Sequence, residues 1–144
     1  MTGDQLPALR VVIDPNVLIS ATITPRGALG QIIGLIDSGT VVPVVCPHLV
    51  DEFENVLKRP KFDRYLDPAR RDTAIAEFKR LAEWHPDPVN PPQVVRDSND
   101  DYLVALASTA NADALTTGDE DLHAVGDPEV VIISPRDLLS RLGQ

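Results

Sequence analysis

The sequence predicts an α/β fold in which helices cover both faces of a parallel sheet, and two observations lead to this prediction. Four short runs are rich in aliphatic residues and read as strands, at residues 11–13, 41–45, 113–116 and 130–133. Short, mostly unbroken runs of this kind are typical of strands that are buried on both faces. Segments with helical patterns separate these runs, as the crossovers of a parallel sheet require.

The helical segments begin and end at residues that favour helix boundaries. Pro47 and Pro135 suit first helical positions, Ser134 suits a cap, and Gly39 suits a helix end. The predicted helical stretches are residues 16–23, 27–39, 47–59, 67–84, 96–112 and 134–142. Residues 85–92 hold four prolines in eight positions, so they form a loop, leading into a short edge strand at residues 93–95.

The length of 144 residues fits one domain with a sizeable core, which we place at residues 10–140, with tails at residues 1–9 and 141–144. The chain has no long uncharged apolar run, and its start lacks an export signal, so we expect a cytoplasmic protein. The single cysteine, Cys46, lies in an apolar run and is expected to fill the core.

The charge balance is acidic, with 22 Asp and Glu residues against 13 Lys and Arg residues and a formal net charge of −9. Such a surface repels a polyanion, so nucleic acid could bind only through bound cations or a local basic strip. A basic protein partner is favoured by the same charge.

Acidic residues stand where predicted strands end and helices begin. The candidates are Asp14 after the first strand, Glu52 within a helix, Asp100 and Asp101 at a helix start, and Asp119 and Asp121 after a later strand. Ligands of open parallel sheets gather at the carboxyl ends of the strands. Carboxylates that converge there repel one another unless a cation binds, and Mg²⁺ or Mn²⁺ prefers such oxygen ligands. The set therefore indicates metal-assisted hydrolysis.

Each acid also has a purely structural explanation. Asp14 suits a helix cap, and Asp100 or Asp101 complements the positive end of a helix dipole. Glu52 resembles the other solvated acids of its helix, and Asp119 suits a turn. Only the shared placement of these acids favours a functional site.

Other chemistries have less support. The three histidines show no ligand spacing, and the sequence has neither a Walker-type phosphate loop nor a dinucleotide-binding fingerprint. Ser20 and Ser134 have no evident base, so a hydrolase triad is not indicated.

Four segments together resemble the PIN-domain family, in particular its toxin branch in toxin–antitoxin systems, the VapC-like ribonucleases. They are "VVIDPNVLISA", "PHLVDEFENVLKRPKF", "VRDSNDDYLVALASTANADALTTGDEDL" and "IISPRDLL". The resemblance runs from about Arg10 to Leu139. It implies a three-layer α/β/α sandwich and Mg²⁺- or Mn²⁺-dependent cleavage of RNA.

The resemblance also implies roles for individual residues. It assigns catalysis to Asp14, Glu52, Asp100 and Asp119, metal binding to Asp14, Asp100 and Asp119 with Asp101 and Asp121 as further candidates, and support to Asn16 and Thr117. Asp100 fits the third acid best because the family's apolar positions then fall on Leu103 and Ala107, although Asp101 is its direct neighbour. The candidates for contact with RNA are Arg26, Lys58, Arg59, Lys61 and Arg96.

A toxin needs restraint, so the resemblance implies a cognate antitoxin, and a basic side chain from it would complement the acidic site. A homodimer is implied as well. One position departs from the family, because Pro15 stands where Thr or Ser usually follows the first aspartate.

Two further hypotheses stay open, one motivated by Pro15 and the net charge of −9, the other by the fact that other folds also end a first strand on an acidic residue. The first is a catalytically weak PIN module that acts by binding a partner protein or RNA. The second is an aspartyl-phosphate phosphatase or receiver-like regulator, which is disfavoured because position 16 is Asn where such a phosphatase carries a second acid.

Overall fold

The computed structural model describes residues 7–89, 101–124 and 129–144. Its centre is a five-stranded sheet in the order β3-β2-β1-β4-β5, and every neighbouring pair of strands is parallel. The strands are β1 (Leu9–Ile13), β2 (Val41–Val45), β3 (Glu83–Trp84), β4 (Ala114–Thr116) and β5 (Ile132–Ile133). The predicted parallel sheet is therefore confirmed.

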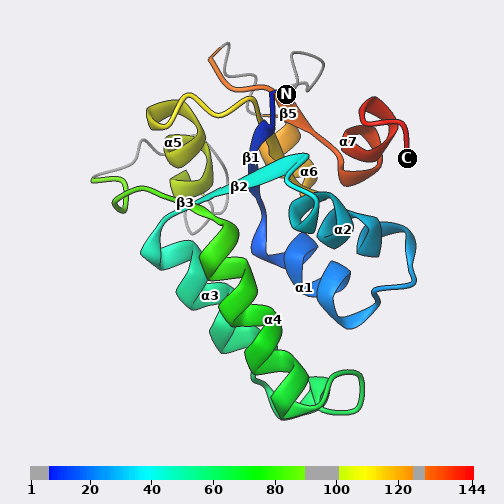
Figure 1. Cartoon of the computed structure of the whole chain (residues 1–144). Coiled ribbons are helices and arrows are strands. Elements are labelled where there is room, and N and C mark those ends of the chain that lie inside the picture. The colour runs from blue at the N-terminus through cyan, green and yellow to red at the C-terminus, as the bar shows by residue number, and fades with distance from the viewer. Residues whose placement is uncertain (1–6, 90–100, 125–128) are drawn as a thin grey trace.

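Helices connect the strands and cover the sheet (Figure 1). They are α1 (Pro15–Ile23), α2 (Gln31–Asp37), α3 (Pro47–Leu57), α4 (Pro68–Leu81), α5 (Asp101–Thr109), α6 (Glu120–His123) and α7 (Pro135–Arg141), with short 3-10 turns η1 (Ala28–Gly30) and η2 (Pro60–Phe62). A proline opens α1, α3, α4 and α7, where its missing N–H costs nothing. Because crossovers are right-handed, α1 to α4 take one face of the sheet and α5 and α6 the other, which gives the three layers.

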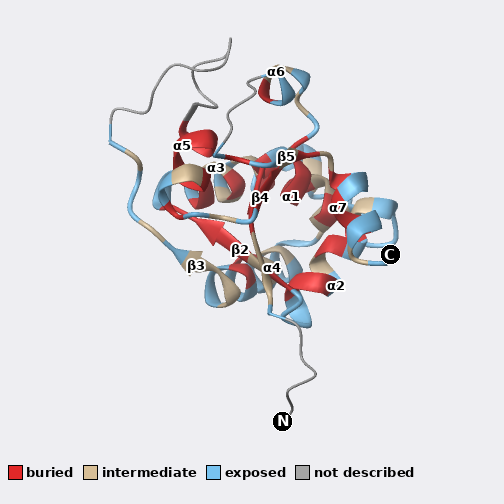
Figure 2. Ribbon diagram, turned by 90° about the horizontal axis from the view of Figure 1, so that it is seen from above, coloured by how far each residue is buried: buried red, intermediate tan, exposed pale blue. Residues whose placement is uncertain are grey.

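The core is built from strand residues that are buried on both faces of the sheet. Val11, Val12 and Ile13 of β1 are at most 1% exposed, and Figure 2 shows buried strands at the centre of the molecule. Phe53 and Phe78 lie 5.2 Å apart between their ring centres and join α3 to α4. Within the described residues, no helix is both long enough and apolar enough to cross a bilayer.

The structure corrects two predicted elements. The helix expected at residues 67–84 ends at Leu81, because the backbone of Ala82 turns to an extended conformation with a ψ angle of 152°. Glu83 and Trp84 then pair with Val44 and Val45 as the edge strand β3. The loop expected after β4 contains the short helix α6. The edge strand predicted at residues 93–95 lies outside the described residues.

Candidate acidic site

Asp14 is a buried carboxylate at the junction of β1 and α1. It follows the last residue of β1, caps α1, and is only 5% exposed. Its Oδ1 accepts a hydrogen bond of 3.0 Å from the backbone N–H of Asn16, and its Oδ2 accepts one of 2.7 Å from the hydroxyl of Thr117. These bonds and the positive end of α1 offset part of the cost of burying the charge.

The fold brings this carboxylate to the point where the strand order reverses. β1 lies between β2 and β4, so the segments that follow β1 and β4 leave the same edge of the sheet side by side. A cavity of about 380 Å³ opens there, lined by Asp14, Asn16, Val17, Ser20, Leu29, Gly118, Asp119 and Pro135. Reversal points of this kind are where open α/β sheets bind their ligands.

The turn after β4 supplies the second carboxylate of the cavity. Asp119 caps α6, its Oδ1 accepting a hydrogen bond of 2.9 Å from the backbone N–H of Asp121. The N–H of Asp119 donates to the hydroxyl of Thr117 over 3.0 Å, and the ring Nε2 of His123 lies 2.7 Å from the carbonyl oxygen of Thr117. The hydroxyl of Thr117 therefore joins the turn that carries Asp119 to Asp14.

Glu52 lies on α3 and is held by a tyrosine from α5. The hydroxyl of Tyr102 donates a hydrogen bond of 3.1 Å to Oε1 of Glu52. Burial raises the pKa of Tyr102 far above its ordinary value, and the carboxylates of Glu52 and Asp14 raise it further. The phenol therefore stays protonated and acts as a donor. The ring of His48 meets that of Tyr102 edge-on, with 4.4 Å between their centres.

The described part of the chain offers these carboxylates no cationic partner. Within residues 7–89, 101–124 and 129–144, no Lys, Arg or His forms an ion pair with Asp14, Glu52 or Asp119. Each ionised carboxylate can accept several hydrogen bonds or metal bonds, so Asp14 keeps acceptor capacity beyond its two bonds. Oxygen donors without a counter-charge fit a hard divalent cation in their chemistry.

The described residues alone do not complete a metal site. Among them, no group of three or more His, Cys, Asp or Glu side chains could hold a metal ion. Asp100, the predicted third acid, lies outside the described residues, as does Arg96. Asp101 begins α5, but its side chain is not described.

The structure thus groups some of the predicted residues and leaves others apart. Asp14, Asn16 and Asp119 share the cavity, and Thr117 links the two acids. Asp121 lies in the first turn of α6, and Arg26, Lys58, Arg59 and Lys61 are exposed at loops and helix ends. Cys46 is fully buried, as predicted for a core residue, and burial raises the pKa of its thiol to about 11.

Sequence reasoning missed Tyr102 as a partner of Glu52. One signal points to it, because Tyr102 directly follows the paired acids at the start of α5 and is the single aromatic residue of that helix. Sequence reasoning also gave no role to Ser20. This residue lines the acidic cavity one helical turn after Asn16.

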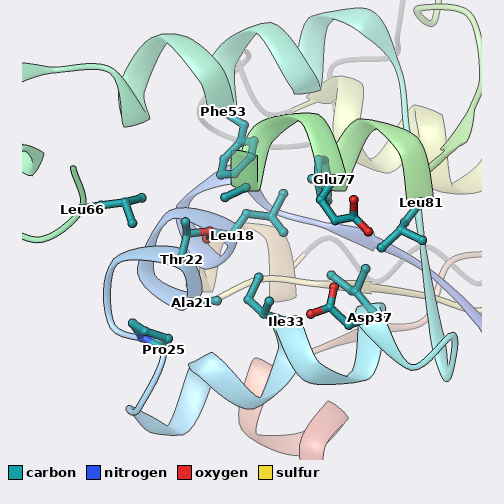
Figure 3. Close-up of a pocket in the computed structure, with 13 residues that line it drawn as sticks. Leu18, Ala21, Thr22, Pro25, Ile33, Asp37, Phe53, Leu66, Glu77 and Leu81 are labelled. Atoms are coloured by element: carbon teal, nitrogen blue, oxygen red, sulfur yellow. Dashed lines mark hydrogen bonds between the residues drawn. The ribbon is translucent and has the colours of Figure 1, made fainter. Parts of the chain in front are cut away.

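A second cavity, of about 250 Å³, lies between α1, α2, α3 and α4 (Figure 3). Aliphatic and aromatic side chains such as Leu18, Ile33 and Phe53 line most of it, and the carboxylates of Asp37 and Glu77 also contribute. It contains none of the predicted site acids, so the two cavities are chemically distinct although both touch α1.

Comparison with known proteins identifies the family. The PIN domain family matches residues 10–121, which include Asp14, Glu52 and Asp119. The uncharacterized protein MJ1680 of Methanocaldococcus jannaschii is 32% identical over 119 residues, which are 83% of this chain and 76% of that protein. The crystal structure of PAE2754 from Pyrobaculum aerophilum superimposes with a TM-score of 0.64 over 99% of both chains at 17% identity, which supports the fold. PIN domains are generally nucleases, and this chain belongs to the PIN domain family.

Proposed function

We propose that this protein is a metal-dependent endoribonuclease that hydrolyses RNA phosphodiesters in the cytoplasm, as the toxin of a toxin–antitoxin pair. Its place in a family of nucleases supports hydrolysis of nucleic acid. The observation that carries the proposal is the carboxylate of Asp14, which is 5% exposed, faces the cavity that Asp119 also lines, and has no cationic partner among the described residues.

Asp14 and Asp119 would hold Mg²⁺ or Mn²⁺, together with Asp100 or Asp101 and with Asp121 as a further candidate. The bound cation would activate a water molecule and neutralise charge on the phosphodiester. Thr117 holds the carboxylate of Asp14 through its hydroxyl, and Asn16 also lines the same cavity. Glu52, oriented by Tyr102, is the remaining acid for proton transfer or cation binding.

The test is cleavage of structured and unstructured RNA by the purified protein with Mg²⁺, Mn²⁺ or a chelator. We expect cutting that requires the cation and that Asp14→Asn reduces by at least about a hundredfold, because losing even a residue that supports a metal ligand costs about 10- to 100-fold. Asp37→Asn is the matched control, since it removes an exposed acid of the apolar cavity. Cutting in chelator, or full activity of Asp14→Asn, would contradict the proposal.

The toxin role adds a partner of opposite charge. A net charge of −9 favours a basic antitoxin, and a Lys or Arg side chain from it would pair with Asp14 and Asp119, which form no ion pair with any residue that the structure describes. We expect induced expression to arrest growth, Asp14→Asn to relieve the arrest, and a basic protein to co-purify. A homodimer belongs to the same proposal, and light scattering of the purified chain tests it.

Pro15 supports a second candidate function, a catalytically weak PIN module that binds a partner protein or RNA. Pro15 is buried at the first position of α1, beside Asp14, and provides neither a hydroxyl nor a backbone N–H there. Pro15→Thr separates the two functions. A large gain in cleavage favours the weak module, whereas an unchanged rate shows that the proline does not limit catalysis.

A further inference from the structure

Helices α3 and α4 run side by side away from the sheet and are joined at their far end (Figure 1). Residues 58–71, here called the basic tip, span this end. They hold six of the 13 Lys and Arg residues of the chain, namely Lys58, Arg59, Lys61, Arg64, Arg70 and Arg71. With only Asp63 and Asp67 as acids, the basic tip has a net charge of +4, which leaves −13 for the rest of the chain. The cations are therefore concentrated on one projection.

Most of these cations are free to meet a ligand. Lys58 pairs with Glu54 at 3.6 Å, and Arg71 pairs with acids of α4 and the tip. The other four, Arg59, Lys61, Arg64 and Arg70, are exposed and form no ion pair with any residue that the structure describes. Unpaired cations gathered on an acidic protein form an electrostatic footprint for a polyanion.

An exposed aromatic ring lies among these cations. Tyr65 is 55% exposed, whereas most large apolar side chains of the described residues are buried. The guanidinium of Arg64 lies 5.4 Å from the centre of the Tyr65 ring. Cations that track a phosphate backbone, combined with an aromatic platform for bases, are the features by which proteins bind single-stranded nucleic acid. A duplex offers phosphates but keeps its bases stacked inside.

The basic tip continues from the helix that carries Glu52. Lys58 follows the last residue of α3 and lies six positions after Glu52, a rise of about 9 Å along the helix axis. An RNA strand that passes the acidic site can therefore extend along α3 to the basic tip.

We propose that the basic tip binds a single-stranded stretch of RNA, with Arg59, Lys61, Arg64 and Arg70 contacting phosphates and Tyr65 stacking on a base. This inference rests on the proposed RNA substrate and deepens it, because it makes unpaired RNA the preferred form. The tip would supply the attraction that the acidic remainder of the surface lacks.

The experiment measures binding apart from cleavage. The probe is a fluorescein-labelled 12-nucleotide single-stranded RNA, titrated with the full-length Asp14→Asn protein in chelator at several salt concentrations. Arg59→Ala combined with Arg64→Ala should weaken binding about tenfold and flatten the slope of log affinity against log salt by about 1.4, or 0.7 for each lost phosphate contact. Arg136→Ala with Arg141→Ala, which removes the same charge from α7, should have a much smaller effect.

Tyrosine variants test the stacking contact. Tyr65→Ala should weaken binding about tenfold with no change in the salt slope, and Tyr65→Phe should restore it. Binding should also be tighter than for a duplex of equal length. Three results would overturn the inference: no binding of the single strand, tip variants that bind like their parent, or tighter binding of poly-glutamate, which would indicate an acidic protein partner. Since cleavage is not measured, a loss of binding in the tip variants supports the inference even if the nuclease assay fails.

Discussion

The hydroxyl of Thr117 lies 2.7 Å from Oδ2 of Asp14 and joins the ends of two neighbouring parallel strands. The same hydroxyl accepts the N–H of Asp119 over 3.0 Å, so one side chain positions both carboxylates of the acidic cavity. Thr116, one residue earlier, is equally buried, yet its hydroxyl has no hydrogen-bond partner in the described structure. Two adjacent threonines thus differ in what their hydroxyls contribute.

This difference predicts opposite outcomes for two variants. Thr117→Val removes a hydrogen bond to a buried carboxylate and should lower the free energy of unfolding by about 1.5–3 kcal/mol. Thr116→Val replaces an unpaired hydroxyl by a methyl group of similar shape and should be neutral or slightly stabilising. Urea denaturation of both variants checks this. Equal losses would mean that the bond to Asp14 contributes nothing specific.

The position of Asp14 could be predicted from the sequence, because an aliphatic strand that stops at an acid is a local pattern. The edge strand at Trp84 could not, since two residues become a strand only through pairing with Val44 and Val45, which lie about 40 residues earlier in the chain. The bond between Tyr102 and Glu52 is non-local in the same way, because it joins two helices across 50 positions. Local patterns thus located the acids, and tertiary contacts determine how they are held.

Tyr102→Phe removes only the hydroxyl that holds Glu52. The free energy of unfolding should fall by about 1 kcal/mol, because a partly buried carboxylate loses its donor. If Glu52 serves the proposed cleavage, the rate at saturating cation should fall about tenfold, equivalent to about 1.4 kcal/mol. Thr73→Val is the control, since it removes an exposed hydroxyl from α4. A cleavage rate equal to that of the parent would show that Glu52 does not need this bond.

Glu83 predicts a dependence of stability on pH. Hydrogen bonds from Arg10, and a further one from His85, lower the pKa of Glu83 from 4.5 to about 2. Because the folded-state pKa is the lower one, the stabilisation is complete above about pH 4.5 and is lost as the pH falls toward 2. Glu83→Gln should therefore have a lower Tm than the parent at pH 6, and the difference should shrink below pH 4.5.

A thermal scan at several pH values measures this difference. Asp51→Asn serves as the control, because Asp51 is exposed and forms no ion pair with the residues described. A gap between parent and Glu83→Gln that stays constant from pH 6 to pH 2 would rule out the ion pair as its source.

Gly30, which directly precedes α2, and Gly34, which lies within α2, differ in the space around them. A Cβ at Gly30 would overlap the carbonyl group and Cα of Pro25, and backbone atoms cannot move aside as a flexible side chain can. A Cβ at Gly34 would meet nothing within 4 Å, and Gly34 is exposed within the helix. Gly30→Ala should therefore destabilise by about 1–3 kcal/mol, as overpacking does. Gly34→Ala should stabilise by about 0.5–1 kcal/mol through higher helix propensity.

Urea midpoints of the two alanine variants measure the change in stability. The effect of Gly30→Ala should also extend to the acidic cavity. Leu29, the residue before Gly30, lines that cavity beside Asp14, so a shift of the chain at Gly30 moves one of its walls. If the cavity binds the proposed cation, Gly30→Ala should weaken that binding as well as stability, whereas Gly34→Ala should leave it unchanged. If Gly30→Ala proved as stable as the parent, the close approach of Pro25 to Gly30 would not constrain this loop.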